Sequence, residues 1–333
     1  MSGPERSDVL PRAAAAVLSA TFAAGLVSGL LRRRRVLRGR GDEQLFETAA
    51  GNLVSYQLTE PATAVPGPVV VCEAGLLSTA EHWSWLSRLL AAGHPVLTYN
   101  RAGYGRGEYR RTEPFTVAGA AADLHDLVRH ACGSRQVVLA GHSLGGYIVL
   151  RALESLRDLT TGVVLIDPSH PAELLRSKSQ AMGAEAFTFA LKLMPGSMAL
   201  GLGGLLRRPS WVDLLPEGDR RLALDHYRDA KLWRAGVREW HGVYGEFLNH
   251  DGSTPKVGVS LCLVAAAVTH DRDPVQAELH GEFVAASPDG RQFLIEDASH
   301  DELLLNEKPA REIAALIEDF VAGPAAGGTG EDG

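Results

Sequence analysis

The sequence has few cysteines and no surplus of basic residues. Its three cysteines, Cys72, Cys132 and Cys262, are scattered and odd in number, and none belongs to a C-x-x-C pair. This pattern favours neither a disulfide framework nor a zinc site. The formal net charge of −7 gives no reason to expect nucleic acid as a partner, because nucleic-acid-binding domains are usually basic. We therefore expect no metal and no nucleic acid.

The N-terminal segment, residues 1–41, carries an apolar stretch followed by arginines. Residues 13–31 contain no charged side chain, and Arg32–Arg35 follow at once. The length suits a membrane span, although many positions are alanine, glycine, serine or threonine, which insert weakly. A cleaved signal peptide would carry its charge before the apolar stretch. We therefore expect an N-terminal anchor that keeps the rest of the chain at the cytoplasmic side of a membrane. The alternative is a helix lying on the domain or on the membrane surface, in an otherwise cytoplasmic protein.

The remainder of the chain alternates between short apolar runs and helical segments. The runs at 69–72, 96–99, 136–140, 163–166, 259–264 and 292–295 predict strands, and 79–92, 117–131, 144–156 and 310–321 predict helices. This alternation is typical of an α/β domain with a mostly parallel central sheet and helices on both faces. A hairpin at 44–48 and 53–58 precedes them. We expect this domain to cover 42–322, with a helical cap inserted at about 168–255. The tail 323–333, rich in glycine, alanine and acidic residues, is expected to be disordered.

The motif with the clearest chemistry is Gly141-His142-Ser143-Leu144-Gly145-Gly146. It follows an apolar run and opens a predicted helix, which is the strand–turn–helix setting of a nucleophile elbow. Ser143 must then adopt a strained backbone conformation that lifts its hydroxyl above the sheet edge. Glycines at 141 and 145 remove side chains that would collide on that turn, and Gly146 lets the helix pack close to the sheet.

With this motif the chain resembles the α/β-hydrolase superfamily, over about residues 44–321. The stretch 69–76 is similar to the family's oxyanion loop, although Ala74 stands where histidine is common. The resemblance implies that the backbone amides of Leu76 and Leu144 form the oxyanion hole. The stretch 99–107 is similar to a loop that we interpret as structural.

The resemblance also implies a catalytic histidine on a loop after a late strand, and His300 has that place. A neutral imidazole there would take the serine proton and return it to the leaving group. His142 and His270 lack the right place in the chain order. The acid that orients the imidazole could be Asp273, after the strand at 259–264, or Asp167, at the end of the strand at 163–166. The sequence favours neither.

These residues predict a serine hydrolase that cleaves a carboxylic ester or thioester through an acyl-enzyme, with no cofactor. The apolar cap, with Trp211, Trp233, Trp240, Met182, Met194 and Met198, favours a hydrophobic acyl group, although such residues also form a cap's own core. An acyl transferase, a cyclising thioesterase or an amidase would carry the same triad. A non-catalytic binding protein with this fold is the alternative from another class. Serine at 143 disfavours the epoxide hydrolase and dehalogenase branches, which use aspartate.

Overall fold

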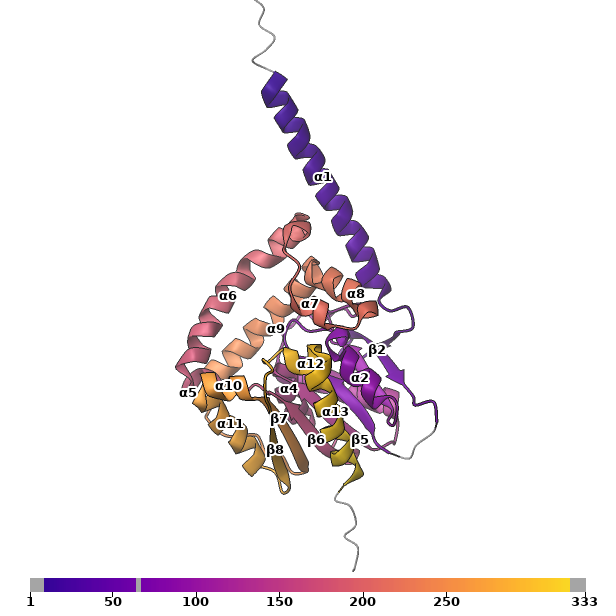
Figure 1. Cartoon of the computed structure of the whole chain (residues 1–333), viewed down its shortest axis with the longest axis vertical. Coiled ribbons are helices and arrows are strands. Elements are labelled where there is room, and N and C mark those ends of the chain that lie inside the picture. The colour runs from indigo at the N-terminus through magenta and orange to yellow at the C-terminus, as the bar shows by residue number, and fades with distance from the viewer. Residues whose placement is uncertain (1–8, 64–66, 324–333) are drawn as a thin grey trace, which may run out of the picture.

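The centre of the computed structural model, which describes residues 9–63 and 67–323, is an eight-stranded sheet (Figure 1). Its strand order is β1-β2-β4-β3-β5-β6-β7-β8. The pairs β1/β2 and β2/β4 are antiparallel and the other neighbouring pairs are parallel. The strands are β1 (Gln44–Glu47), β2 (Leu53–Thr59), β3 (Val69–Glu73), β4 (Val96–Asn100), β5 (Val137–His142), β6 (Thr160–Ile166), β7 (Ser260–Ala266) and β8 (Gly290–Ile295). The predicted α/β class with a mostly parallel sheet is confirmed.

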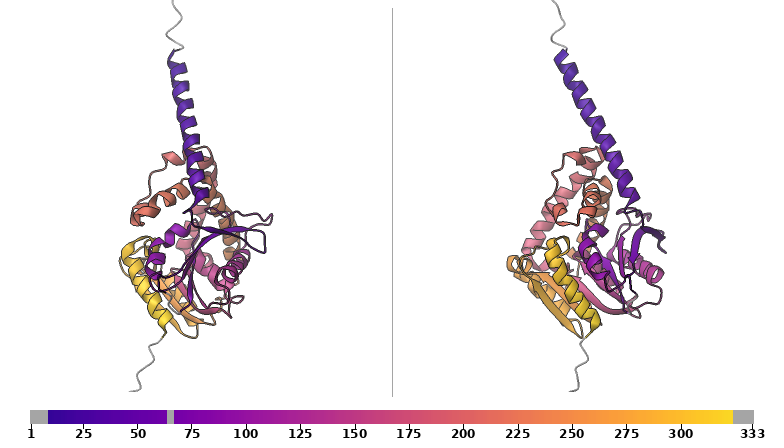
Figure 2. Two further views of the ribbon diagram at one scale, coloured as in Figure 1. Left: turned by 90° about the vertical axis from the view of Figure 1, so that its right-hand side faces the viewer. Right: turned by 45° about the vertical axis from the view of Figure 1, so that its right-hand side comes forward.

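Helices cover both faces of the sheet (Figure 2). Alternate side chains of the central strands pack against one or the other helical layer. In β3, Val69 and Val71 pack in the cluster formed with α3 (Val117–Cys132), α4 (Leu144–Ala152) and α11 (Pro274–Ala285). Val70 and Cys72 pack on the opposite face, against the short helix η1 (Ala80–Trp83), α2 (Ser84–Leu90), α12 (Glu302–Leu305) and α13 (Glu307–Ala322). A strand buried on both faces reads as a continuous apolar run, which is why the sequence predicted these strands well. Cys72 and Cys262 are buried in the second cluster as small hydrophobes.

Between β6 and β7 the chain forms a helical cap. It comprises α5 (Glu173–Arg176), α6 (Lys178–Ala199), η2 (Leu202–Leu205), α7 (Trp211–Leu214), α8 (Glu217–Tyr227) and α9 (Ala230–Leu248). The predicted insertion at about 168–255 covers these helices. Figure 1 shows α6 and α9 side by side above the end of the sheet where α10 (Ala267–Arg272) and α12 lie. Helices α6 and α9 contact each other.

The N-terminal segment is a single helix, α1 (Val9–Arg38), which projects from the domain (Figures 1 and 2). Two arginines near its end hold acidic residues of the cap: Arg33 binds Asp229 and Arg35 binds Asp225, each with a shortest N–O distance of 2.5 Å. Across residues 9–63 and 67–323, no helix combines the length and the apolar character that a membrane crossing needs. The expected membrane-spanning anchor at 13–31 is therefore not found, because alanine, glycine, serine and threonine dilute its few large apolar side chains. The tail expected to be disordered lies, from residue 324 onward, outside the described residues.

A buried ionic cluster fixes the cap to the sheet. Arg101, which follows β4, donates to both carboxylate oxygens of Glu239 on α9, at 2.8 Å each. The same guanidinium binds the Glu73 carboxylate at the end of β3, at 2.6 Å. All three side chains are almost fully buried, so each charge depends on its partners for compensation.

Replacing Glu239 with alanine should lower the free energy of unfolding by about 3–5 kcal/mol, because it removes one partner of a buried charge. Urea denaturation would measure the change. Glu185→Ala, at an exposed position on α6, is the matched control and should change stability by less than about 0.5 kcal/mol. Equal stability of the two variants would contradict a role for the cluster in holding the cap.

Candidate active site

Ser143 lies on a strained turn between β5 and α4. Its backbone has φ 54° and ψ −126°, a region that non-glycine residues rarely adopt. A Cβ at Gly145 would lie 2.2 Å from the carbonyl oxygen of Glu73, and one at Gly141 would lie 2.5 Å from the carbonyl oxygen of Gly145. One at Gly146 would lie 2.8 Å from Pro168. The steric reason that the sequence suggested for the three glycines is confirmed.

His300 and Asp167 form a hydrogen-bonded pair at the carboxyl ends of the strands. Asp167 follows β6, with φ 42°, and its Oδ2 lies 2.7 Å from Nδ1 of His300. Oδ2 also accepts from the hydroxyl of Thr269, at 2.8 Å. The Asp167 side chain is almost completely buried, whereas that of His300 is partly exposed. A carboxylate in this place fixes the imidazole orientation and stabilises its protonated form.

His300 and Asp167 shift each other's pKa. Burial alone would lower the pKa of His300, but the hydrogen bond that its ring donates to Asp167 and the charge of that carboxylate raise the pKa above its ordinary value. Burial opposes ionisation of Asp167, yet its hydrogen bond with His300 and the charge of that imidazole hold its pKa at about 2. Asp167 is thus a carboxylate throughout the neutral range.

Asp273, the other acid that the sequence left open, has a different partner set. Its Oδ1 accepts from the amide of Val275 and so caps α11. The hydroxyls of Ser177 and Ser179 donate to its Oδ2, at 2.5 and 2.7 Å. Asp273 therefore does not contact His300. The stretch between β7 and Asp273 folds as α10 and carries Asp273 toward the cap.

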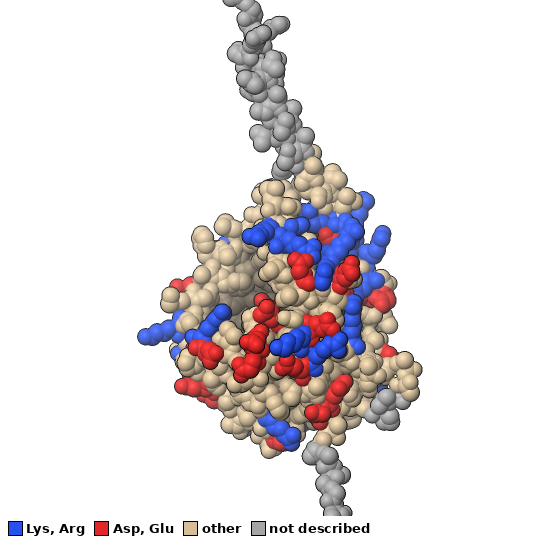
Figure 3. Space-filling model, in the orientation of Figure 1, with Lys and Arg blue, Asp and Glu red and all other residues tan. Residues whose placement is uncertain are grey.

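Ser143, His300 and Asp167 line one cavity of about 550 Å³ beneath the cap. Figure 3 shows a hollow in this face of the molecule, with acidic side chains along its lower edge. Among the residues that line the cavity, only Pro168 and Val268 are apolar. Most of these side chains carry a polar or charged group, so no wall of large apolar side chains is present to support the expectation of a hydrophobic acyl group.

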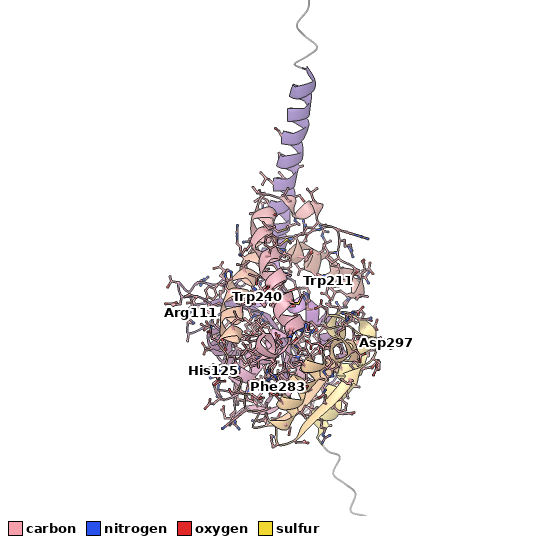
Figure 4. All side chains as sticks on the ribbon, turned by 90° about the vertical axis from the view of Figure 1, so that its left-hand side faces the viewer. Arg111, His125, Trp211, Trp240, Phe283 and Asp297 are labelled. Atoms are coloured by element: carbon pink, nitrogen blue, oxygen red, sulfur yellow. The ribbon has the colours of Figure 1, made fainter. Side chains whose placement is uncertain are left out.

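The aromatic and methionine residues of the cap do not line this cavity. Trp233 and Met198 are buried in the cap's own cluster, and Trp240 and Met194 pack at its edge. Trp211, labelled with Trp240 in Figure 4, stacks edge-on against Tyr227. Met182 is 72% exposed. For all of these residues except the exposed Met182, the structure supports the interpretation that they pack within the cap itself.

The loop after β3, which carries Leu76, lies next to Ser143. A Cβ at Gly75 would lie 3.2 Å from Cβ of Ser143, so the two backbones are in close contact. Arg101 donates to the carbonyl oxygens of Ala74 and Gly75, which fixes the loop. Within the described residues, the amides of Leu76 and Leu144 donate to no backbone carbonyl and no side chain. Both donors are therefore available to a ligand.

His142 supports the histidine loop, a role that the sequence did not reveal. Its Nε2 lies 3.1 Å from the carbonyl oxygen of His300, and the two rings lie 4.5 Å apart. Burial, together with the charge of His300, lowers the pKa of His142 to about 3. A neutral imidazole can donate from Nε2 to that carbonyl. Its place inside the G-x-S-x-G motif was the available signal, but the contact joins residues far apart in the sequence.

Comparison with known families agrees with this geometry. The model of the alpha/beta hydrolase family matches residues 65–316, which is more than half of the chain. The chain belongs to the alpha/beta hydrolase family.

Curated relatives of this alpha/beta hydrolase carry the names of hydrolases. A protein named "Putative carbamate hydrolase RutD" from Variovorax paradoxus is 29% identical over 144 residues, covering 42% of this chain and 48% of that protein. One of the same name from Escherichia coli is 25% identical over 141 residues, covering 40% and 53%. The chain thus spans about half the length of these curated relatives. The comparisons support a hydrolase.

Two solved structures share the fold of this alpha/beta hydrolase. An epoxide hydrolase from Vigna radiata has a TM-score of 0.65 at 17% identity, covering 85% of this chain and 99% of that one. A thermophilic esterase from Thermogutta terrifontis has a TM-score of 0.59 at 17% identity, covering 84% and 98%. At this identity they establish the fold alone.

Because Asp167 and Asp273 have different hydrogen-bond partners, their substitution should affect the activity of this alpha/beta hydrolase differently. If Asp167 orients His300, Asp167→Asn should lower kcat by about 10⁴-fold. Asp273→Asn should change kcat by less than about tenfold, because it removes a helix cap worth about 1 kcal/mol of stability.

In the wild type, kcat/KM should fall as pH decreases through a midpoint above 6.5, since protonated His300 cannot accept the serine proton. Ester hydrolysis across a pH series would measure both effects, and equal losses in the two variants would contradict the assignment.

Proposed function

We propose that the protein is a serine hydrolase that cleaves a carboxylic ester or thioester with Ser143, His300 and Asp167. The observation that carries this proposal is the 2.7 Å hydrogen bond between Asp167 and His300, in the cavity that Ser143 also lines. A serine on a strained turn, an imidazole and a buried carboxylate in one cavity are the parts of a nucleophilic triad. The fold and the relatives agree with a hydrolase, and the residue roles are our inference.

In this mechanism Oγ of Ser143 attacks the substrate carbonyl carbon while His300 accepts the hydroxyl proton. Asp167 stabilises the resulting imidazolium. The amides of Leu76 and Leu144 bind the oxyanion, and one such donor is worth about 10²–10³ in kcat. His300 then protonates the leaving group as the tetrahedral intermediate collapses to the acyl-enzyme. A water molecule, activated by His300 in the same way, releases the acid and restores Ser143.

Among the other reactions that this site permits, carbamate cleavage has specific support. The relatives that match the chain over about two fifths of its length are named carbamate hydrolases, and a carbamate carbonyl would undergo the same attack. Amide cleavage and acyl transfer use the same residues. Ser143 at the nucleophile position favours all of these reactions over epoxide opening, since the resemblance implies aspartate there in epoxide hydrolases.

Labelling with a fluorophosphonate probe tests the proposal against a non-catalytic binding protein. Wild-type protein should form a covalent adduct at Ser143, because an activated serine attacks the phosphorus centre. Ser143→Ala should not label. Ser169→Ala is the matched control, since Ser169 lines the same cavity, and it should label like the wild type. Intact-protein mass spectrometry would give the stoichiometry, and equal labelling of wild type and Ser143→Ala would reject the proposal.

We further propose that the protein binds the cytoplasmic surface of a membrane with α1 and the cap tip. Exposed apolar side chains gather there: Val27 and Leu30 of α1 are 56% and 65% exposed. Leu193 of α6 and Leu205 of η2 are 61% and 79% exposed. A Cβ at Gly201, the residue before η2, would lie 2.7 Å from the backbone of α1, so the segments form one surface. The nearby belt of basic side chains (Figure 3) suits the anionic lipids of the cytoplasmic leaflet.

Sedimentation with lipid vesicles tests this surface. The protein should bind vesicles that contain phosphatidylserine, and binding should weaken in high salt because the arginine contribution is screened. The double variant Leu193→Ser/Leu205→Ser should bind at least about tenfold more weakly, since each buried CH₂ contributes about 0.8 kcal/mol. Leu294→Ser, at a 47% exposed position on β8, is the control. Equal binding of both variants would contradict the proposed surface.

A further inference from the structure

The turn that carries Asp167 is strained, and three neighbouring segments hold it. Asp167 has φ 42°, a value that non-glycine residues rarely adopt and that persists only where the surrounding structure fixes it. The amide of Asp167 donates to the carbonyl oxygen of Val264 on β7, at 2.7 Å. The amide of Ser169 donates to the carbonyl oxygen of Ser143, at 3.0 Å. The third contact comes from α11.

This third contact is a hydrogen bond from a buried histidine. Nε2 of His280, on α11, lies 3.1 Å from the carbonyl oxygen of Pro168, the residue after Asp167. The His280 side chain is almost completely buried. Within residues 9–63 and 67–323, no other side chain hydrogen-bonds to the backbone of residues 167–169. His280 is therefore the side chain that fixes the carbonyl side of this turn.

A second imidazole fixes the orientation of the His280 ring. Nε2 of His270, on α10, lies 2.9 Å from Nδ1 of His280. The carbonyl of Pro168 can only accept, so Nε2 of His280 carries a hydrogen, and Nδ1 of the neutral ring accepts from His270. Both ring nitrogens of His280 thus have a partner, and neither is left to exchange a proton with a substrate.

We infer that His280 is a positioning residue for the proposed triad: it holds the turn so that the Asp167 carboxylate stays in contact with His300. The inference rests on the proposed function, which gives Asp167 its role. Oδ2 of Asp167 lies 2.7 Å from Nδ1 of His300, and the backbone of the turn sets the position from which that side chain extends. A misplacement of about 1 Å in a catalytic group can lower a rate by about 10²-fold.

Substitution of His280 leaves the charge near His300 unchanged at neutral pH. Burial lowers the pKa of His280 to about 4, so its ring is neutral there. The other titratable groups that face it are Asp167, His170, His270 and His300, and the substitution removes none of them. A change in the pKa of His300 would therefore indicate a displaced Asp167 carboxylate and not a lost charge.

Nuclear magnetic resonance of the histidine side chains tests the inference without any need for turnover. The signal of His300 is identified by its absence from His300→Gln. Asp167 raises the pKa of His300 in the wild type, and Asp167→Asn gives the value without the carboxylate. In His280→Leu the pKa of His300 should fall from the wild-type value toward that of Asp167→Asn. In His280→Gln it should stay near the wild-type value, because a glutamine amide can also donate to the Pro168 carbonyl.

Ester hydrolysis gives the second measurement. His280→Leu should lower kcat by about tenfold to 100-fold, whereas His280→Gln should stay within about threefold of the wild type. Phe283→Leu, at a fully buried position one turn along α11, is the matched control. It removes packing but no hydrogen bond, so it should lower the melting temperature and leave the pKa of His300 and the kcat of the folded protein near the wild-type values.

The outcomes separate this inference from the proposed function. If His280→Leu keeps the wild-type pKa of His300 or the wild-type kcat, the positioning role is overturned. It is also overturned if Phe283→Leu lowers that pKa as much. If the pKa changes as expected but no ester is hydrolysed in a manner that depends on Ser143, the proposed function fails, and the positioning has no catalytic role although His280 still holds Asp167 against His300.

Discussion

The close approach of α4 to the ends of β3 and β5 is the constraint on which the site depends. Backbone atoms of Gly145 and Glu73 come so near that no Cβ fits between them, and this contact forces the positive φ of Ser143. The carboxyl ends of parallel strands meet at one edge, so the turns after β3, β5 and β6 deliver Gly75, Ser143 and Asp167 to the same place. Strain at Ser143 persists because the packing of the sheet leaves the turn no alternative.

A second constraint joins the cap to this edge. Arg101 links the carboxylates of Glu73 and Glu239 and holds two carbonyl groups of the loop that carries Leu76. Tyr104 adds to the cluster: its hydroxyl donates to Glu239 and accepts from the amide of Leu77. The position of the cap and the shape of the expected oxyanion loop are therefore set by one group of buried charges.

The cap separates two environments. Its aromatic and methionine residues pack on one another, while the residues that it turns toward the catalytic edge are mainly polar. The tryptophan and methionine residues thus stabilise the cap without forming an apolar pocket beside Ser143. The cavity beside Ser143 is lined by side chains such as Glu173 and Gln276, whose places the composition of the cap did not indicate.

Much of the fold and the proposed nucleophile followed from the sequence alone. The strands buried on both faces appear as continuous apolar runs, and the glycines around Ser143 record a steric requirement that is local in the chain. His300 could be placed because it follows a strand near the end of the sheet. Only the tertiary structure decided that Asp167, and not Asp273, contacts His300, because the choice depends on how α10 folds and which hydroxyls the cap brings to Asp273. It also decided that most of the side chains that line the cavity carry a polar or charged group. Local patterns record what a residue's neighbours in the chain require, whereas contacts between distant segments are fixed only when the sheet and the cap have packed together.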